Sequence, residues 1–334
     1  MRQRGVWALA WQRFRRDRLG FACFIVVIAY VAIMIAAAAG WIVRDWSEEV
    51  GVSYAPPTFL GAEEAAAVEA KARAHQGPVA DYGIPDPLVA DLAEIAKGLS
   101  GAASDAARAP TLAFGGDKWG RDVLKKAVKG TQTSLFVGLT AAMLASFLGT
   151  LFGAQAGYRG GRVDDFFNWL YSVFTSVPYL LLVLAIAAVV NQKGTLTVIL
   201  ILGLTGWTGI FRLIRAEYMK HKVREYVLAA DAIGASSSRR MYVHILPNVS
   251  HVLLVQLSLH VVLFIKSEVI LTFLGFGVGV DTVSWGSMLA EAGSELLLGK
   301  WWQLAAATAA MAVLVTAFSL FTDAMRDAMD PKLK

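Results

Sequence analysis

Residues 131–158 read TQTSLFVGLTAAMLASFLGTLFGAQAGY and carry no charged side chain. A helix needs about 20 apolar residues to cross a bilayer, so this stretch is long enough to span one. Apolar residues make up 56% of the 334-residue chain, and further windows with few or no charged residues occur at 20–43, 166–192, 194–215, 249–275 and 301–322. The sequence therefore predicts an all-α integral membrane protein with six transmembrane helices.

The segments between these helices fall on two sides of the membrane. One side holds 1–19, 216–248 and 323–334, and the other holds the loops 44–130 and 276–300. Arg and Lys concentrate on the first side, so the positive-inside rule places both termini in the cytoplasm. Lys125, Lys126 and Lys129 oppose this orientation, but they lie in a long loop, which the rule largely exempts. The net charge of +5 is then a topology signal, and no nucleic-acid motif accompanies it.

The first window, 20–43, follows an Arg-rich start as a signal peptide would. It is longer than the apolar core of a signal peptide, so we interpret it as an uncleaved signal anchor. Before it, Trp7, Trp11 and Phe14 recur at helical spacing and predict a short amphipathic helix in the membrane interface. This helix serves either as a membrane anchor or as a clasp on a partner subunit. In the outer loop, alanine and charge predict two surface helices at 61–75 and 87–107, forming a small cap.

Catalytic and metal-binding patterns are missing from the sequence. Cys23 is the only cysteine, and the five histidines are scattered without metal-ligand spacing, so neither redox chemistry nor a metal site is expected. The Gly-Lys pair at Gly299 and Lys300 has Ser294 where a phosphate-binding loop requires glycine. We expect no catalytic residue, no cofactor and no ATP-binding site in this chain.

Small residues mark one face of the helix predicted at 131–158. Gly149, Gly153 and Gly157 recur at four-residue spacing. Such spacing lets two helix backbones approach closely. We expect this face to pack on another helix of this chain or on a partner subunit.

The loop 216–248 contains a folded element between two membrane helices. Residues 224–248 read REYVLAADAIGASSSRRMYVHILPN, which predicts a short helix over 223–233 with a smooth alanine surface. Gly234 supplies a left-handed stop, Ser236–Ser238 can cap a second helix, and Pro247 is expected to end it. Two short helices at a fixed angle form a rigid knob suited to a groove on another protein.

This loop resembles the signature of ABC importer permeases, in which a Glu-Ala-Ala triplet is followed by glycine and later by Leu-Pro. The matching residues here, which the resemblance assigns to coupling with an ATPase, are Leu228, Ala229, Ala230, Gly234, Leu246 and Pro247. His244 resembles the variant of the dipeptide and oligopeptide subfamily, whose motif ends in His-x-Leu-Pro-Asn. Other stretches resemble the same subfamily in the same order: RFRRDRLG from Arg13, GGDKWGRDVL from Gly115, GYRGGRVDD from Gly157, SEVILTFLGFGV from Ser267, WGSMLAE from Trp285 and DAMRDAMDP from Asp323.

The chain departs from the family pattern at two places. Leu228 stands where the triplet has glutamate, and Glu225, one turn earlier, is the residue able to replace that carboxylate. A Gly-Gly-Asp turn at Gly115 replaces the usual Gly-Thr-Asp.

The resemblance implies a type I importer permease fold with an extracytoplasmic insertion between the first two helices, in a bacterial inner membrane. It implies a heterodimer with a homologous permease, two cytoplasmic ATPases that hold ATP and magnesium, and an extracytoplasmic binding protein that delivers di- or oligopeptides. The subfamily that this chain resembles also includes importers of nickel chelates, opines, antimicrobial peptides and sugars. These solutes therefore remain alternative substrates. A membrane scaffold protein is the remaining alternative.

Ionisable residues inside a transmembrane helix predict function by default. Lys266 and Glu268 lie in the fifth predicted helix and, two residues apart, point in different directions. Glu268 either faces the translocation path or bonds to a neighbouring helix, whereas Lys266 is expected to snorkel or to pair with the sister subunit. Phe273 and Phe276, among glycines, form either a gate or a simple helix exit.

Overall fold

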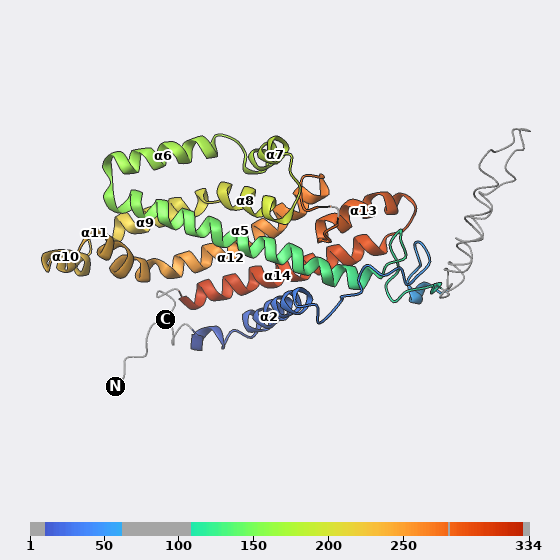
Figure 1. Ribbon diagram of the computed structural model, residues 1–334. Coiled ribbons are helices and arrows are strands. Elements are labelled where there is room, and N and C mark those ends of the chain that lie inside the picture. Colours follow the sequence, from blue (N-terminus) through green and yellow to red (C-terminus); the bar gives the residue numbers. More distant parts are fainter. Residues whose placement is uncertain (1–10, 62–107, 280, 330–334) are drawn as a thin grey trace, which may run out of the picture.

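The computed structural model describes residues 11–61, 108–279 and 281–329. Within these ranges the chain is helical, with only isolated β-bridges in the outer loop. Most helices run roughly along one long axis (Figure 1). The helices are α2 (Arg18–Ala38), η1 (Thr58–Leu60), α5 (Val123–Arg159), α6 (Gly161–Thr175), α7 (Tyr179–Val190), α8 (Thr195–Thr205), α9 (Thr208–His221), α10 (Glu225–Ala232), α11 (Ser237–Arg239), η2 (Arg240–Ile245), α12 (Leu246–Phe273), α13 (Trp285–Leu297) and α14 (Trp302–Met329).

The predicted all-α membrane fold is confirmed by the described helices. Those long and apolar enough to cross a membrane are Arg18–Ala38, Val123–Arg159, Thr195–His221, Ser237–Phe273 and Trp302–Met329. The bent pair α6 and α7 supplies a sixth crossing if it counts as one span. The surface helices predicted at 61–75 and 87–107 fall almost entirely in 62–107, outside the described residues.

The predicted third helix, 166–192, is broken in the structure. It divides into α6 and α7, which meet at an angle of 83°. Pro178 precedes α7 with an extended backbone (ψ 132°). Proline disfavours the helical conformation in the residue before it and cannot donate a backbone hydrogen bond, so the helix stops there. The absence of charged residues from 166–192 does not show this break, because the window is free of charge on both sides of Pro178.

The 37-residue helix α5 is the centre of the bundle. It packs against α2, α8, α9 and α12. The glycine face packs on α9 of the same chain: a Cβ built on Gly153 would lie 2.8 Å from the carbonyl oxygen of Phe211. Gly149 and Gly157 meet α9 in the same way, at 2.8 Å from the Trp207 oxygen and 2.5 Å from the Arg215 oxygen. Close backbone contact of this kind replaces the hydrophobic driving force that helices lack in lipid.

The two ends of the chain meet beside each other. Phe14, just before α2, is buried against α14, and its ring lies 5.8 Å from that of Phe321 and 5.7 Å from that of Phe24. The start of α2 and the end of α14 therefore lie at the same end of the bundle as α10 (Figure 1). The helix α13 lies at the opposite end (Figure 1).

Candidate functional site

The knob predicted in the loop 216–248 is present at one end of the bundle (Figure 1). Helix α10 ends before Gly234, whose φ of +81° favours glycine because it has no side chain. Ser236 then caps α11, with its Oγ accepting the Arg239 N–H at 3.3 Å. Asp231 and Arg240 form an ion pair that joins α10 to η2. The chain therefore holds α10 at a fixed angle to the following helix.

Pro247 does not end the second helix, as the sequence analysis had expected. It lies in the first turn of α12, and α11, η2 and α12 form one span from Ser237 to Phe273. Backbone N–H groups in the first turn of a helix have no intrahelical acceptor. Proline, which lacks this N–H, is therefore tolerated there. The π-helical segment η2 supplies the transition between α11 and α12. The knob is thus the tip of a long transmembrane helix with α10 folded against it.

Helix α10 has a buried face and an exposed face. Val227 is buried in a cluster with Tyr218, Met241 and Ile245, and Ala230 is buried as well. The Tyr218 hydroxyl donates to the Met241 carbonyl at 3.1 Å, which ties α9 to η2. Packed side chains therefore connect the knob to α9 and α12.

The exposed side of α10 and its C-cap carries apolar residues beside the carboxylates of Glu225 and Asp231. Leu228 is 54% exposed and Ile233 is 85% exposed, and Ala229 is exposed beside them. Glu225 is also exposed, one turn before Leu228. Of the other motif residues, His244 and Leu246 are half-buried and Pro247 is exposed. An apolar face on a rigid element outside the bundle suits a docking surface for another protein.

Glu268 is fully buried between helices. Its carboxylate accepts the Ser134 hydroxyl at 2.7 Å and the Thr272 hydroxyl at 2.9 Å. The Ser134 Oγ in turn accepts the N–H of Trp285 at 3.2 Å. This geometry corresponds to the alternative in which Glu268 bonds to a neighbouring helix. It joins α12 to α5 and to the start of α13.

Phe273 and Phe276 are exposed at the end of α12. Between them Gly275 takes a φ of +86°, and the Phe276 N–H donates to the Leu271 carbonyl at 2.9 Å. This is a glycine helix stop, which turns the chain out of α12. The arrangement leaves both rings on the surface, and the gate role stays a prediction.

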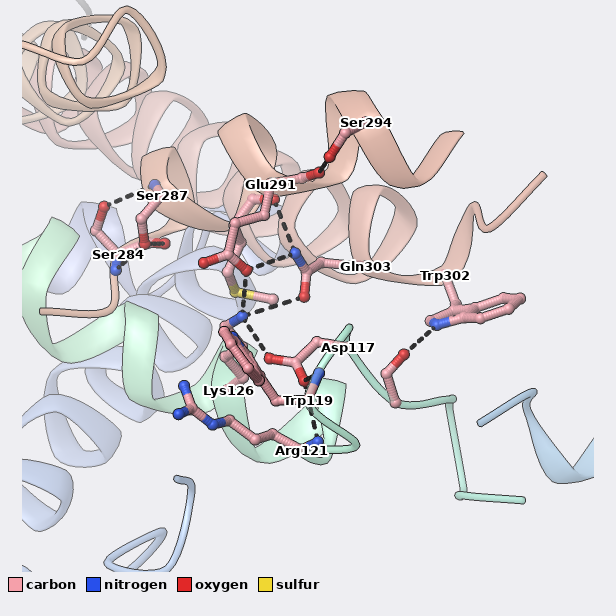
Figure 2. Close-up of polar contacts among 12 residues, drawn as sticks. Asp117, Trp119, Arg121, Lys126, Ser284, Ser287, Glu291, Ser294, Trp302 and Gln303 are labelled. Atoms are coloured by element: carbon pink, nitrogen blue, oxygen red, sulfur yellow. Dashed lines mark hydrogen bonds and ion pairs between the residues drawn. The ribbon is translucent and has the colours of Figure 1, made fainter. Parts of the chain in front are cut away.

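A polar cluster at the end opposite the knob was not predicted from the sequence. The buried Lys126 ammonium contacts Asp117 at 2.8 Å and Glu291 at 2.5 Å, and lies 3.3 Å from the Gln303 Oε1 (Figure 2). Gln303 also donates to Glu291 at 3.1 Å. The cluster joins α5, the outer loop, α13 and α14. The sequence did not indicate a role for Lys126, because its partners lie as far as 177 residues away in the chain.

The outer loop is positioned by the same cluster. Asp117 accepts the N–H groups of Trp119 at 2.9 Å and Arg121 at 3.0 Å, and the Trp302 indole donates to the Gly116 carbonyl at 2.7 Å (Figure 2). Gly115, with a φ of +89°, lies against the Trp302 ring, where a Cβ would come within 2.6 Å. The Gly-Gly-Asp turn therefore fits the face of this tryptophan.

The neighbouring lysines are also held locally. Lys125 pairs with Asp45 and, as hydrogen-bond donor, lowers the pKa of that carboxyl. Lys129 donates to the Ala37 carbonyl at 3.4 Å. The three lysines that opposed the positive-inside assignment thus serve the packing of α5 against α2 and the outer loop.

One carboxylate of this region lacks a close hydrogen-bond partner among the residues that the structure describes. Both oxygens of the buried Glu295 lack one. Burial raises the pKa of Glu295 to about 7, with a smaller contribution from the charges of Glu291 and Asp117, opposed by Lys126. Glu295 is thus poised to exchange a proton near neutral pH.

Comparison with known proteins places this architecture in a family. A family model described as "Binding-protein-dependent transport system inner membrane component" matches residues 135–334, and one described as "N-terminal TM domain of oligopeptide transport permease C" matches residues 5–57. The dipeptide transport system permease protein DppC of Bacillus subtilis (strain 168) is 37% identical over 221 residues, which cover 66% of this chain and 69% of that protein.

Two further relatives are similar to the same extent. The oligopeptide transport system permease protein OppC of Bacillus subtilis (strain 168) is 36% identical over 66% of this chain and 72% of its own length. The di/tripeptide transport system permease protein DppC of Pseudomonas aeruginosa (strain UCBPP-PA14) is 34% identical over 66% of this chain and 72% of its own length. Together with the helical membrane fold and the knob, these similarities show that the chain belongs to the family of binding-protein-dependent transport system inner membrane components.

Proposed function

We propose that this chain is one of two permease subunits of an ATP-driven importer that carries di- and oligopeptides into the bacterial cytoplasm. In this proposal a homologous sister subunit encloses the path together with this chain. An extracytoplasmic binding protein delivers the peptide. Two cytoplasmic ATPases hold ATP and magnesium and drive the transport cycle.

The exposed apolar face of α10 is the observation that carries the proposal. A free monomer would leave Leu228 and Ile233 in water at the tip of the bundle. A groove on an ATPase would cover them, and the rigid link between α10, η2 and α12 would carry the ATPase motion into the membrane helices. A scaffold protein would not need that mechanical continuity.

The peptide substrate is supported by the relatives. Those named above are permeases for dipeptides, di/tripeptides and oligopeptides. Nickel chelates, opines and antimicrobial peptides are the alternatives to test. Uptake of a labelled dipeptide by the complex in proteoliposomes, with the binding protein and ATP supplied, is the expected result. Uptake of a nickel chelate in place of the dipeptide would reassign the substrate.

The orientation belongs to the same proposal. We place both termini and the knob in the cytoplasm, because the basic residues concentrate on that side. The polar cluster around Lys126 and helix α13 then lie on the outer side, where the binding protein would dock.

A charge on the knob tests the coupling role. Ile233→Asp places a carboxylate where the proposal expects an apolar groove, so we expect the ATPase subunits to lose at least tenfold in affinity for the permease, since an unpaired buried charge is strongly unfavourable. Co-purification of the ATPase with the tagged permease measures this loss. Leu297→Asp is the matched control, because Leu297 is 89% exposed at the opposite end and Ile233 is 85% exposed. Equal ATPase recovery with both variants would contradict the proposal.

A further inference from the structure

Lys266 lies on an exposed, otherwise apolar face of α12. The members of this face follow one another at alternating intervals of four and three residues, which places them on one side of a helix. They are Leu259, Leu263, Lys266, Ile270 and Phe273. Phe273, a gate candidate, therefore shares its face with Lys266.

The lysine has no counter-charge within the described part of the chain. No ion pair or hydrogen bond joins the Lys266 side chain to residues 11–61, 108–279 or 281–329. Glu268 is not the counter-charge of Lys266, because it is two residues away on the helix and is held by Ser134 and Thr272 on the buried side. An anion for Lys266 must come from outside these residues.

The direction of the helix opposes snorkelling of Lys266 toward the nearer end of α12. Lys266 is seven residues before the end of α12 at Phe273, or roughly 10 Å at 1.5 Å per residue. Helical side chains lean toward the N-terminus of their helix, which here is the far end, twenty residues away at Leu246. Snorkelling would require the side chain to run against this lean. The lean of the side chain directs the ammonium away from this end and toward the middle of the span Ser237–Phe273, where a charge that faces lipid is costly.

We infer that Lys266 lines the translocation path and binds the carboxylate of the transported peptide, an inference that rests on the proposed importer function. Peptides of different sequence share few groups, and the C-terminal carboxylate is the anionic one. A single cation among apolar side chains accepts that group without selecting the peptide's side chains. One such contact is also weak enough for the peptide to leave, as conduction through a path requires.

The inference predicts a preference that the permease itself imposes. A peptide with a free C-terminus should pass faster than the same peptide with a C-terminal amide, because only the carboxylate carries a negative charge that forms an ion pair with the ammonium. The expected preference is roughly tenfold, the effect of one such bond.

The test compares these two peptides, made with uncharged side chains, in proteoliposomes containing the complete complex. Initial uptake rates are measured at saturating concentrations of loaded binding protein, so that its own affinity does not enter. We expect Lys266→Met to slow the free acid roughly tenfold and to leave the amide unchanged, which removes the preference. Lys266→Arg retains the positive charge and should retain the preference. Lys193→Met removes an exposed lysine outside this face and serves as the control.

The possible outcomes separate this inference from the proposed function. If Lys266→Met keeps the wild-type ratio of acid to amide uptake, Lys266 does not bind the carboxylate. If Lys266→Met fails to assemble with the sister subunit and a compensating change of a sister carboxylate restores assembly, the lysine pairs with that subunit and the inference is overturned. If the wild-type complex retains its ATPases but imports neither peptide, the peptide assignment itself fails.

Discussion

At the residue scale, Glu295 is buried and its carboxylate lacks a close hydrogen-bond partner among the described residues. The carboxylate is enclosed near Asp117, Lys126 and Glu291, and the charge of Glu295 reaches Tyr54, whose pKa it helps to raise. Three carboxylates then face one lysine. Burial disfavours the charged form of Glu295 and is the main reason that its pKa rises to about 7, with a smaller contribution from the charges of Glu291 and Asp117.

The stability of the protein should therefore depend on pH through Glu295. Its folded pKa is about 7 and its ordinary value is 4.5, so the folded chain holds a proton that the unfolded chain releases between these values. Stability falls as pH rises through this window, by up to about 3 kcal/mol in total. Glu295→Gln cannot ionise, so we expect it to gain unfolding temperature relative to wild type at about pH 8 and not at about pH 4.

Thermal unfolding in detergent at both pH values measures this difference. Glu48→Gln is the control, because Glu48 is exposed in the outer loop. If the unfolding temperature of Glu295→Gln follows that of wild type at every pH, ionisation of Glu295 does not lower the stability of the folded protein.

At the element scale, the contact between α5 and α9 depends on glycine. The built Cβ of Gly153 meets backbone atoms of α9, namely the Phe211 oxygen at 2.8 Å and the Arg215 nitrogen at 3.0 Å. Backbone cannot move aside as a side chain can. The Arg215 guanidinium also binds Asp164 of α6 through two hydrogen bonds of 2.5 and 2.6 Å, so a displaced α9 would disturb that pair.

Gly153→Ala should consequently destabilise the protein. We expect a loss of about 1–3 kcal/mol, the usual cost of overpacking, seen as a lower unfolding temperature in detergent. Gly293 of α13 is the matched control, since nothing lies within 4 Å of its built Cβ. Gly293→Ala should be neutral or stabilising by up to about 1 kcal/mol, because alanine favours the helix. Equal effects of the two substitutions on the unfolding temperature would show that close packing of α5 on α9 does not require glycine at position 153.

At the scale of the whole molecule, the two ends differ in chemistry. One end presents the apolar knob, and the other presents the Lys126 cluster and the outer loop bound to Trp302. Helices α5, α12 and α14 connect these ends (Figure 1). A change at the knob can therefore reach the outer end through helices that are continuous along the bundle.

Labelling of single cysteines tests the orientation. Cys23 is buried, and Cys23→Ala gives a background without thiols. In this background, produced without ATPase subunits, we expect a membrane-impermeant maleimide to label Leu297→Cys in intact spheroplasts. Ile233→Cys should react only after permeabilisation, because both sites are equally exposed but lie on opposite sides of the membrane. The reverse pattern would invert the topology.

The amino-acid sequence by itself determined the class of fold, the rigid knob and the family resemblance. These depend on local features: uninterrupted apolar windows, the stop at Gly234, the cap at Ser236 and a linear motif. Apolar windows identify membrane helices because the bilayer requires every backbone polar group to be satisfied within the helix. The same reasoning wrongly predicted that Pro247 ends a helix, whereas it lies in the first turn of α12. A proline in the sequence is compatible with both positions.

Only the tertiary structure decided which side chains meet. It buried Glu268 against Ser134 and left Lys266 on an open face, although the two lie in the same apolar window. It also brought Lys126 to Glu291 across 165 residues. Such contacts depend on how helices rotate and pack against each other, and each is stabilised only where both partners are removed from water together. Spacing within a single helix carries no information about that rotation.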